Sequence, residues 1–120
     1  MSLPTAAELV RAFGPAKKAL GQCFLTDPSI LERLVETAQL SPGCPVLEIG
    51  PGPGGLTRTL LDAGHPVTAI DLDQRVLTHL ETHLTHPKLQ VVGGNALTTD
   101  IQQLLDTSPA AILGNLPYNI

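Results

Sequence analysis

The chain is poor in aromatic residues and in cysteine. Its 120 residues include two phenylalanines, one tyrosine and no tryptophan, and its two cysteines are Cys23 and Cys44. Two cysteines are too few for the disulfide framework of a small secreted domain. No histidine lies near either of them in the sequence, so they do not form a zinc-binding pattern. We therefore expect two unpaired thiols and no metal site.

Long apolar runs are also missing. No stretch approaches the ~20 residues that a membrane-spanning helix needs. The N-terminus has neither the charged start nor the continuous apolar segment of a signal peptide. A chain of 120 residues without an internal repeat can form one domain at most. These features predict a cytoplasmic protein.

Basic residues are too few for a self-sufficient nucleic-acid binder. Seven Lys and Arg residues stand against eleven Asp and Glu residues, which gives a net charge of −4. The local exception is a group formed by Arg11, Lys17 and Lys18 in the N-terminal arm. These three either contact a phosphate backbone or are ordinary solvated charges, and the sequence leaves both interpretations open.

Two short helices are expected before residue 45. Thr5 followed by Glu8 is a capping-box pattern, and Gly14 and Pro15 form a stop signal, so a helix should span residues 5–13. Asp27 and Pro28 should open a second helix as N-cap and first turn, which ends at residues 41–43. We expect that helix to bury one face, made of Ile30, Leu31, Leu34, Val35 and Ala38.

Strands then alternate with helices to the end of the chain. We expect strands near 45–50, 66–71, 89–93 and 110–114, and helices at 55–63, 73–84 and 99–105. This alternation predicts a parallel sheet with right-handed crossovers, which binds ligands at the carboxyl ends of its strands.

Four polar or glycine residues follow those strands. Gly50, Asp71, Asn95 and Asn115 each come at a strand end, so we expect them to converge on one crevice. The alternative is that each is merely a turn residue, as Gly, Asp and Asn often are. One shared site explains all four positions more simply than four independent turns do.

The first predicted strand runs into a glycine cluster at residues 48–57, EIGPGPGGLT. Glycines let a loop backbone pass close to a ligand. Gly50, Gly52 and Gly55 also satisfy the dinucleotide pattern G-x-G-x-x-G, and Asp71, 21 residues after Gly50, could accept hydrogen bonds from ribose hydroxyls. These features fit either a nicotinamide dinucleotide or a nucleoside-type methyl donor.

The last residues favour the methyl donor. Residues 115–118 read NLPY after an apolar run, and an amide beside an aromatic ring at a strand tip suits an exocyclic amino group better than hydride transfer. Tyr118 is expected to stack on a base.

His79 and His83 are four residues apart on a predicted helix. Because no third ligand is visible, we interpret them as a solvated face rather than a metal site.

Five motifs in order resemble one family. Residues 17–25 (KKALGQCFL), 48–57, 69–73 (AIDLD), 94–97 (GNAL) and 115–118 are similar to the motifs of the small-subunit ribosomal RNA adenine N6-dimethyltransferases, to which the erythromycin-resistance methylases are related. The resemblance runs from Lys17 to Ile120. Any one motif would be a weak signal, whereas five in the family's order are a strong one.

The resemblance implies an α/β fold of the Rossmann-like, S-adenosylmethionine-dependent methyltransferase type, with a parallel sheet flanked by helices. Residues 1–26 would form an N-terminal helix and cofactor-contacting arm, and residues 27–120 the first part of the methyltransferase domain. The fold would be C-terminally incomplete, because later strands and the family's C-terminal helical RNA-binding domain are absent. An open sheet edge would then allow self-association, and the fragment by itself would be inactive.

The resemblance also implies site residues. The catalytic set would be Asn115, Leu116, Pro117 and Tyr118. The contacts to S-adenosylmethionine would come from Gln22, Cys23, Leu25, Gly50, Gly52, Asp71, Leu72, Asn95, Ala96 and Asn115.

Three positions depart from the family's usual residues. The family usually has Asn or His at the position of Cys23, Glu at that of Asp71 and Asp at that of Asn95. Asp71 can still accept two hydroxyls, but Asn95 lacks a charge and a thiol is a poor hydrogen-bond partner. We therefore expect a cofactor affinity below the family norm.

The function implied is N6-dimethylation of adenines in small-subunit ribosomal RNA, during assembly of that subunit. The partner would be that RNA or the assembling subunit, without a membrane. Two alternatives stay open at this point: a non-catalytic relative that binds RNA or a ribosome, and a nicotinamide-dinucleotide-binding Rossmann domain.

Overall fold

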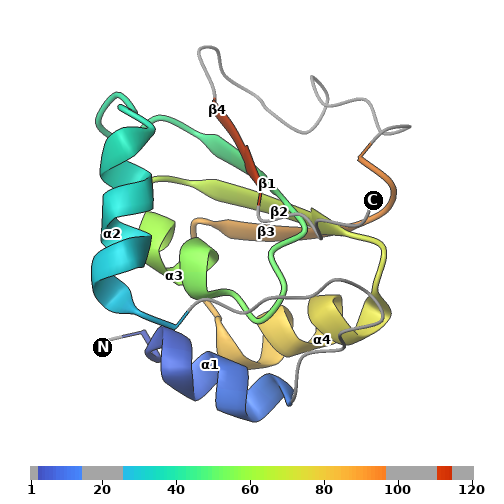
Figure 1. The fold of residues 1–120 in the computed structure, drawn as a ribbon. Coiled ribbons are helices and arrows are strands. Elements are labelled where there is room, and N and C mark those ends of the chain that lie inside the picture. Colours follow the sequence, from blue (N-terminus) through green and yellow to red (C-terminus); the bar gives the residue numbers. More distant parts are fainter. Residues whose placement is uncertain (1–2, 15–25, 97–110, 115–120) are drawn as a thin grey trace.

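The computed structural model describes residues 3–14, 26–96 and 111–114. Figure 1 shows the arrangement of their helices and strands. The elements are α1 (Ala6–Phe13), α2 (Pro28–Thr37), β1 (Val46–Ile49), α3 (Gly55–Asp62), β2 (Val67–Asp71), α4 (Gln74–His83), β3 (Leu89–Gly93) and β4 (Ala111–Gly114). Their bounds agree closely with the predicted ranges, and the helix expected at 99–105 lies outside the described residues. Within these ranges, no helix has the length and apolar character needed to cross a bilayer.

The four strands form one parallel sheet in the order β3-β2-β1-β4. Ile49 lies opposite Ile70 on one side and Gly114 on the other, and Asp71 lies opposite Gly93. The carboxyl ends of all four strands therefore meet at one edge of the sheet. This confirms the predicted α/β class and the parallel sheet.

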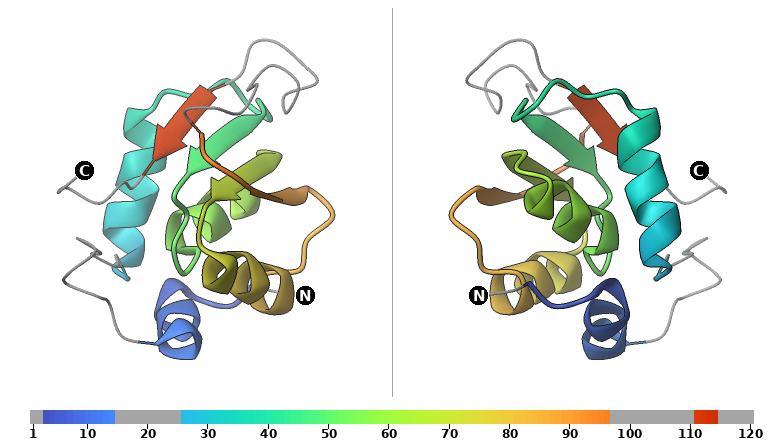
Figure 2. Two further views of the ribbon diagram at one scale, coloured as in Figure 1. Left: turned by 90° about the vertical axis from the view of Figure 1, so that its right-hand side faces the viewer. Right: turned by 90° about the vertical axis from the view of Figure 1, so that its left-hand side faces the viewer.

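Helices α1, α3 and α4 lie on one face of the sheet, and α2 packs against α3 (Figures 1 and 2). α3 connects β1 to β2, and α4 connects β2 to β3. The core between helices and sheet is aliphatic apart from one ring. It comprises Leu9, Phe13, Val46, Leu60, Leu61, Val67, Ala69, Val76, Leu80 and Leu84.

The predicted helix starts are confirmed. The Thr5 hydroxyl accepts from the Glu8 N–H at 3.1 Å, and the Glu8 carboxylate accepts from the Thr5 N–H at 3.0 Å, which is a complete capping box. The Asp27 carboxylate accepts from the Ser29 N–H at 2.9 Å, with Pro28 in the first turn. These local bonds explain why α1 and α2 begin where the sequence predicts.

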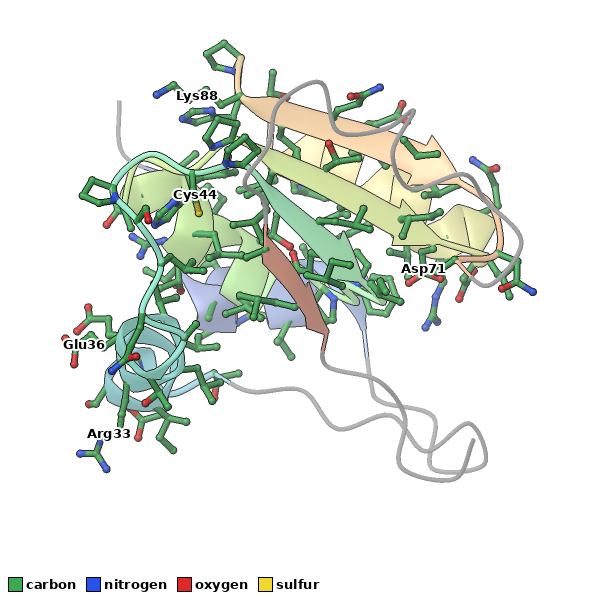
Figure 3. The ribbon with its side chains drawn as sticks, turned by 90° about the horizontal axis from the view of Figure 1, so that it is seen from above. Arg33, Glu36, Cys44, Asp71 and Lys88 are labelled. Carbon is green, nitrogen blue, oxygen red and sulfur yellow. The ribbon has the colours of Figure 1, made fainter. Side chains whose placement is uncertain are left out.

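The expectation for the buried face of α2 is wrong in part. Leu31 is buried and Val35 and Ala38 are half-buried, but Ile30 and Leu34 are 46% and 44% exposed. The reason is that α2 packs along α3 rather than onto the sheet, so only one edge of its apolar face is covered by described residues. Arg33 and Glu36 of α2 point away from the sheet (Figure 3). The helix also ends at Thr37, before the turn at residues 42 and 43.

Candidate functional site

Backbone hydrogen bonds tie together the loops that leave β1, β2 and β3. The Gly50 N–H donates to the Ile70 carbonyl at 3.0 Å, and the Gly94 N–H donates to the Asp71 carbonyl at 3.0 Å. Figure 3 shows Asp71 at the arrowhead end of β2, with Cys44 and Lys88 at the opposite end of the sheet. The structure thus brings Gly50, Asp71 and the turn before Asn95 to one edge, as the sequence predicts.

Asp71 is half-buried at this edge. Its Oδ1 atom accepts from the Asp73 N–H at 2.9 Å, which orients the carboxylate. Burial raises the pKa of the Asp71 carboxyl from its usual value, and the Asp73 N–H opposes that change. Leu72, the next residue, is 73% exposed although it is large and apolar. Asn95 is exposed and Ala96 half-buried in the turn after β3.

The glycine loop, defined here as residues 50–54, has an unusual backbone. Gly50 and Gly52 have φ values of 68° and 56°, which place both in the left-handed region. Gly54 has a φ of 103° and precedes α3 without a side-chain cap. A Cβ atom on Gly54 would lie 2.8 Å from Leu80 Cδ2 and 3.4 Å from Leu84 Cδ2. Helix α4 therefore packs directly against the glycine loop.

Glu48 is a buried carboxyl beneath the glycine loop. It is 0% exposed, and the Thr57 hydroxyl of α3 donates to its Oε1 atom. The Oε2 atom is also buried and has no hydrogen-bond partner among the described residues. Burial raises the pKa of Glu48 to about 7, although the Thr57 hydrogen bond acts in the opposite direction. An unpartnered buried carboxyl oxygen is uncommon and needs a proton or a partner group to satisfy it.

Glu48 belongs to the glycine motif, but no separate role is expected of it from the sequence. The signal that could have found it is its position inside the apolar strand β1, between Leu47 and Ile49. A charged residue almost never occupies a fully buried strand position unless it is paired or functional.

His79 lies behind the glycine loop, and the expected solvated face is wrong for it. The side chain is 7% exposed, and its Nε2 atom lies 2.8 Å from the Pro53 carbonyl oxygen. The reason is α1, because the Phe13 ring packs edge-on against the imidazole at a centroid distance of 4.9 Å. Burial lowers the pKa of His79 from its usual value. His83 is exposed, and within the described ranges no group of three potential ligands could hold a metal ion.

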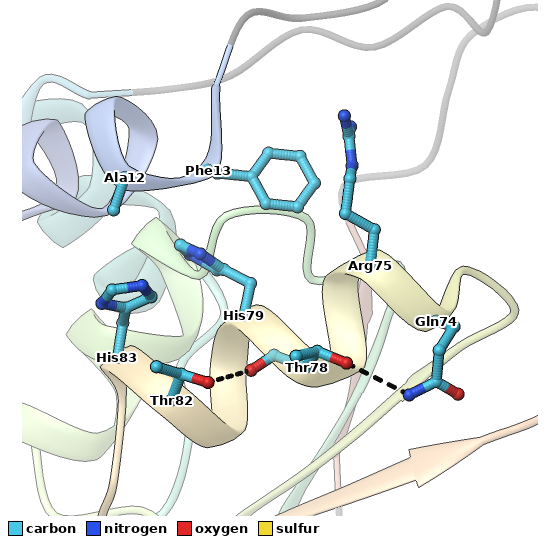
Figure 4. A pocket seen from close by; sticks show the side chains of 8 residues that line it. All are labelled: Ala12, Phe13, Gln74, Arg75, Thr78, His79, Thr82 and His83. Atoms are coloured by element: carbon cyan, nitrogen blue, oxygen red, sulfur yellow. Dashed lines mark hydrogen bonds between the residues drawn. The ribbon is translucent and has the colours of Figure 1, made fainter.

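A cavity of about 370 Å³ opens between α1 and α4 (Figure 4). It is lined by Ala12, Phe13, Gln74, Arg75, Thr78, His79, Thr82 and His83. The Arg75 guanidinium lies 4.1 Å from the Phe13 ring centroid, in cation–π geometry. Its lining comes from α1 and α4 and includes none of Gly50, Asp71 or Asn95, so we assign the candidate site to the strand ends, where the loops are tied together.

Several predicted site residues lie outside the described residues. These are Gln22, Cys23, Leu25, Asn115, Leu116, Pro117 and Tyr118, together with Lys17 and Lys18 of the basic group. Arg11 is exposed on α1, and Cys44 is a free thiol, as expected.

Curated relatives share the sequence over nearly its whole length. The chain is 46% identical over 121 residues to the "Ribosomal RNA small subunit methyltransferase A" of Phenylobacterium zucineum, covering 99% of this chain and 42% of that protein. It is 43% identical over 125 residues to the protein of the same name from Bartonella henselae, covering 99% and 45%. The chain therefore spans less than half the length of these relatives.

Solved structures share the fold. The 23S rRNA methyltransferase ErmE superposes with a TM-score of 0.68 at 39% identity, covering 82% of this chain and 39% of that one. A dimethyladenosine transferase from Plasmodium falciparum superposes with a TM-score of 0.62 at 30% identity, covering 78% and 34%. Residues 15–120 match the family described as "Ribosomal RNA adenine dimethylase". With the tied strand ends, the glycine loop and Asp71 in the positions described above, the chain belongs to the ribosomal RNA adenine dimethylase family.

Proposed function

We propose that this chain carries the cofactor site of an S-adenosylmethionine-dependent methyltransferase that dimethylates N6 of adenines in small-subunit ribosomal RNA. The observation that carries the proposal is the convergence of the glycine loop, Asp71 and the Gly94 turn at one sheet edge, in a chain of this family. Family membership supports a methyl donor over a nicotinamide dinucleotide, although the glycine spacing suits both.

The residues at the strand ends suit the chemistry of this cofactor. The cofactor has a cationic sulfonium and ammonium end, a ribose and an adenine ring. The unpartnered Glu48 Oε2 beneath the glycine loop supplies negative charge or an acceptor for the cationic end. The Asp71 carboxylate can accept from ribose hydroxyls, and exposed Leu72 can pack on an adenine ring. Gly50, Gly52, Asn95 and Ala96 would complete this part of the site.

The remaining cofactor contacts are proposed from the family motifs. Gln22, Cys23 and Leu25 of the N-terminal arm and Asn115 after β4 would contact the cofactor from positions outside the described residues. Because Cys23, Asp71 and Asn95 replace the family's usual residues, we propose a weaker cofactor site than the family norm.

The acceptor chemistry is proposed for residues 115–118. When bound, the cofactor supplies an activated methyl group for direct in-line displacement, so the protein mainly positions the reactants. The Asn115 side-chain oxygen and the Leu116 or Pro117 carbonyl would accept from the N6 hydrogens. These bonds favour a more pyramidal and nucleophilic nitrogen. Tyr118 would stack on a base that is flipped out or single-stranded.

The proposed division of the chain into an arm and a domain also follows from the family. Residues 1–26 would form the N-terminal helix and cofactor arm, and residues 27–120 the first part of the methyltransferase domain, acting on ribosomal RNA in the cytoplasm. The relatives are more than twice as long as the stretch matched here, so RNA-binding surface is expected beyond it. The net charge of −4 supports that division of roles.

Methyl transfer tests this function. Labelled S-adenosylmethionine is incubated with unmodified small ribosomal subunits and with either the 120-residue chain or a form extended to its relatives' length. The RNA is digested and the nucleosides are identified by mass spectrometry. We expect N6,N6-dimethyladenosine with the extended form and none with the 120 residues alone. Absence of N6-methylated adenosine with the extended form would refute the proposed function.

A further inference from the structure

Residues of α4 and α1 support the glycine loop from behind. Leu80 of α4, Leu84 at the C-cap of α4 and Leu9 of α1 surround Gly54, at 2.8, 3.4 and 3.8 Å from where a Cβ atom would stand. These apolar contacts exclude water from the rear of the loop but give it no directional restraint. A directional restraint requires a hydrogen bond, and among the described side chains His79 provides one to this part of the loop.

The His79 bond has a defined polarity. Because the Pro53 carbonyl oxygen can only accept, Nε2 must carry the hydrogen and donate across 2.8 Å. Pro53 lies between Gly52 and Gly54, both with positive φ, so its carbonyl belongs to the part of the loop whose backbone only glycine adopts readily. The Gly54 N–H at the other end of this peptide plane donates to the Pro51 carbonyl at 3.2 Å, so the buried His79 bond adds a second restraint, from another element, to a plane between two glycines.

The imidazole is itself held in place. Figure 4 shows His79 between Phe13 of α1 and His83, one turn further along α4. The Phe13 ring meets the imidazole at an interplanar angle of 73°, and the Arg75 guanidinium covers the same Phe13 ring. The ring of His83 lies 5.0 Å away on the other side. Because Phe13 is buried and His83 is exposed, the contact with Phe13 is the one that sets the Nε2–H direction before any ligand arrives.

We propose that His79 is a positioning residue: its imidazole, held by Phe13, orients the Pro53 carbonyl and thereby presets the glycine loop for the cofactor. This role rests on the proposed function for the identity of the ligand, but the positioning of the loop does not depend on it. It links the N-terminal helix α1 to the cofactor site through a residue that touches neither cofactor nor substrate.

The test compares His79→Leu with His79→Gln. Leucine keeps apolar volume in the buried position and removes the donor, whereas the glutamine amide nitrogen can reach the place of Nε2 and donate again. His83→Ala is the matched control, because it removes an exposed imidazole from the same helix face. Urea unfolding of each variant measures global stability separately. All measurements use the 120-residue chain.

Two readouts are taken. Amide hydrogen exchange of Gly52, Gly54 and Gly55 is followed without ligand, and S-adenosylhomocysteine affinity is measured by calorimetry. For His79→Leu we expect loop exchange and the dissociation constant each to rise about fivefold to tenfold, the effect of one lost hydrogen bond. Exchange in β1 should stay unchanged. His79→Gln should restore both to within about twofold, and His83→Ala should match the wild type.

The outcomes separate the two proposals. Unchanged loop exchange in His79→Leu, or equal losses in the leucine and glutamine variants, would overturn the positioning role, since packing alone would then explain the site. If the unsubstituted chain fails to bind S-adenosylhomocysteine while His79→Leu still loosens the loop, positioning is supported and the cofactor assignment fails instead.

Discussion

Glu48 and Asp71 are carboxyls at neighbouring strand ends, but their surroundings differ. Glu48 is wholly buried with one oxygen unpartnered, whereas Asp71 is half-buried and oriented by a backbone N–H. In both cases burial is the first cause that raises the pKa, because the low-dielectric surroundings disfavour the charged form. The ionisation of Glu48 should therefore make the free energy of unfolding depend on pH.

We predict that the contribution of Glu48 to stability falls as pH rises from about 5 to about 7, opposed by His79, whose pKa burial lowers. Its pKa is about 7 in the folded chain against an ordinary value of 4.5, so the folded state binds the proton more tightly. Its stabilising protonation is complete below the ordinary pKa and is lost as pH passes the folded one. The loss is about 3 kcal/mol at most.

Urea unfolding of Glu48→Gln across this pH range checks the prediction. Glutamine keeps the shape without the charge, so the variant should be more stable than wild type at pH 8, and the difference in stability between them should shift in its favour as pH rises from 5 to 8. Asp62→Asn, at a carboxyl that is 67% exposed, is the control and should follow the wild-type profile. The same pH slope in Glu48→Gln and wild type would contradict the assignment.

Asn95 allows a test by gain of affinity. A carboxylate accepts hydrogen bonds more strongly than an amide does, and the position is exposed in the turn after β3. Asn95→Asp should tighten S-adenosylhomocysteine binding by about 1 kcal/mol or less, measured by calorimetry. A weaker complex would mean that Asn95 is adapted to its neighbours in this chain.

At the scale of elements, the contact between the glycine loop and α4 decides the geometry of the site. Gly54 and Gly64 both have strongly positive φ, at 103° and 93°, but only Gly54 meets neighbouring atoms at the position of a Cβ. Gly64 has nothing within 4 Å there. Comparing substitutions at these two glycines therefore separates the cost of an unfavourable backbone conformation from the cost of a steric clash.

We predict that Gly54→Ala destabilises the chain more than Gly64→Ala. Both alanines carry the left-handed strain of about 1 kcal/mol, and Gly54→Ala must also displace the buried Leu80 side chain, which costs about 1–3 kcal/mol more. Urea unfolding of the two variants measures the difference. Equal losses of stability in the two variants would show that Leu80 can move away from residue 54 at little cost.

The elements also show what the sequence could predict. Local signals gave the starts of α1 and α2 and the alternation of strands and helices, because capping and periodicity depend on near neighbours. The fully buried face predicted for α2 and the solvated face predicted for His79 were wrong, because both depend on which element covers them. Ile30 and Leu34 lack a cover among the described residues, whereas His79 is covered by Phe13 from 66 positions earlier.

At the scale of the whole molecule, the parallel topology explains how distant strand ends come together. With β1 between β2 and β4, the carboxyl ends of all four strands reach the same edge. The sequence predicted that Gly50, Asp71 and the turn at Asn95 lie together at this edge. It could not predict the support of the glycine loop from α1 and α4, because that support depends on tertiary packing. The site residues expected at positions 22, 23, 25 and 115–118 stay predictions.

The sheet order also makes a prediction about association. In the described part of the chain β4 is an edge strand, and Ile112 on it is 53% exposed. An apolar edge strand favours pairing with a second copy, so the 120-residue chain should self-associate with rising concentration. Sedimentation velocity measures this, and Ile112→Lys should reduce it. A concentration-independent monomer would contradict the prediction.

The central claim is that the strand ends of β1, β2 and β3 bind S-adenosylmethionine, and calorimetry tests it most directly. S-adenosylhomocysteine and NAD are titrated separately into the chain and into Asp71→Ala. We predict binding of S-adenosylhomocysteine and not of NAD, with a loss in Asp71→Ala of about 1.5–3 kcal/mol, as expected for hydrogen bonds to a charged group. Equal affinity in Asp71→Ala and wild type, or preferential binding of NAD, would contradict the account.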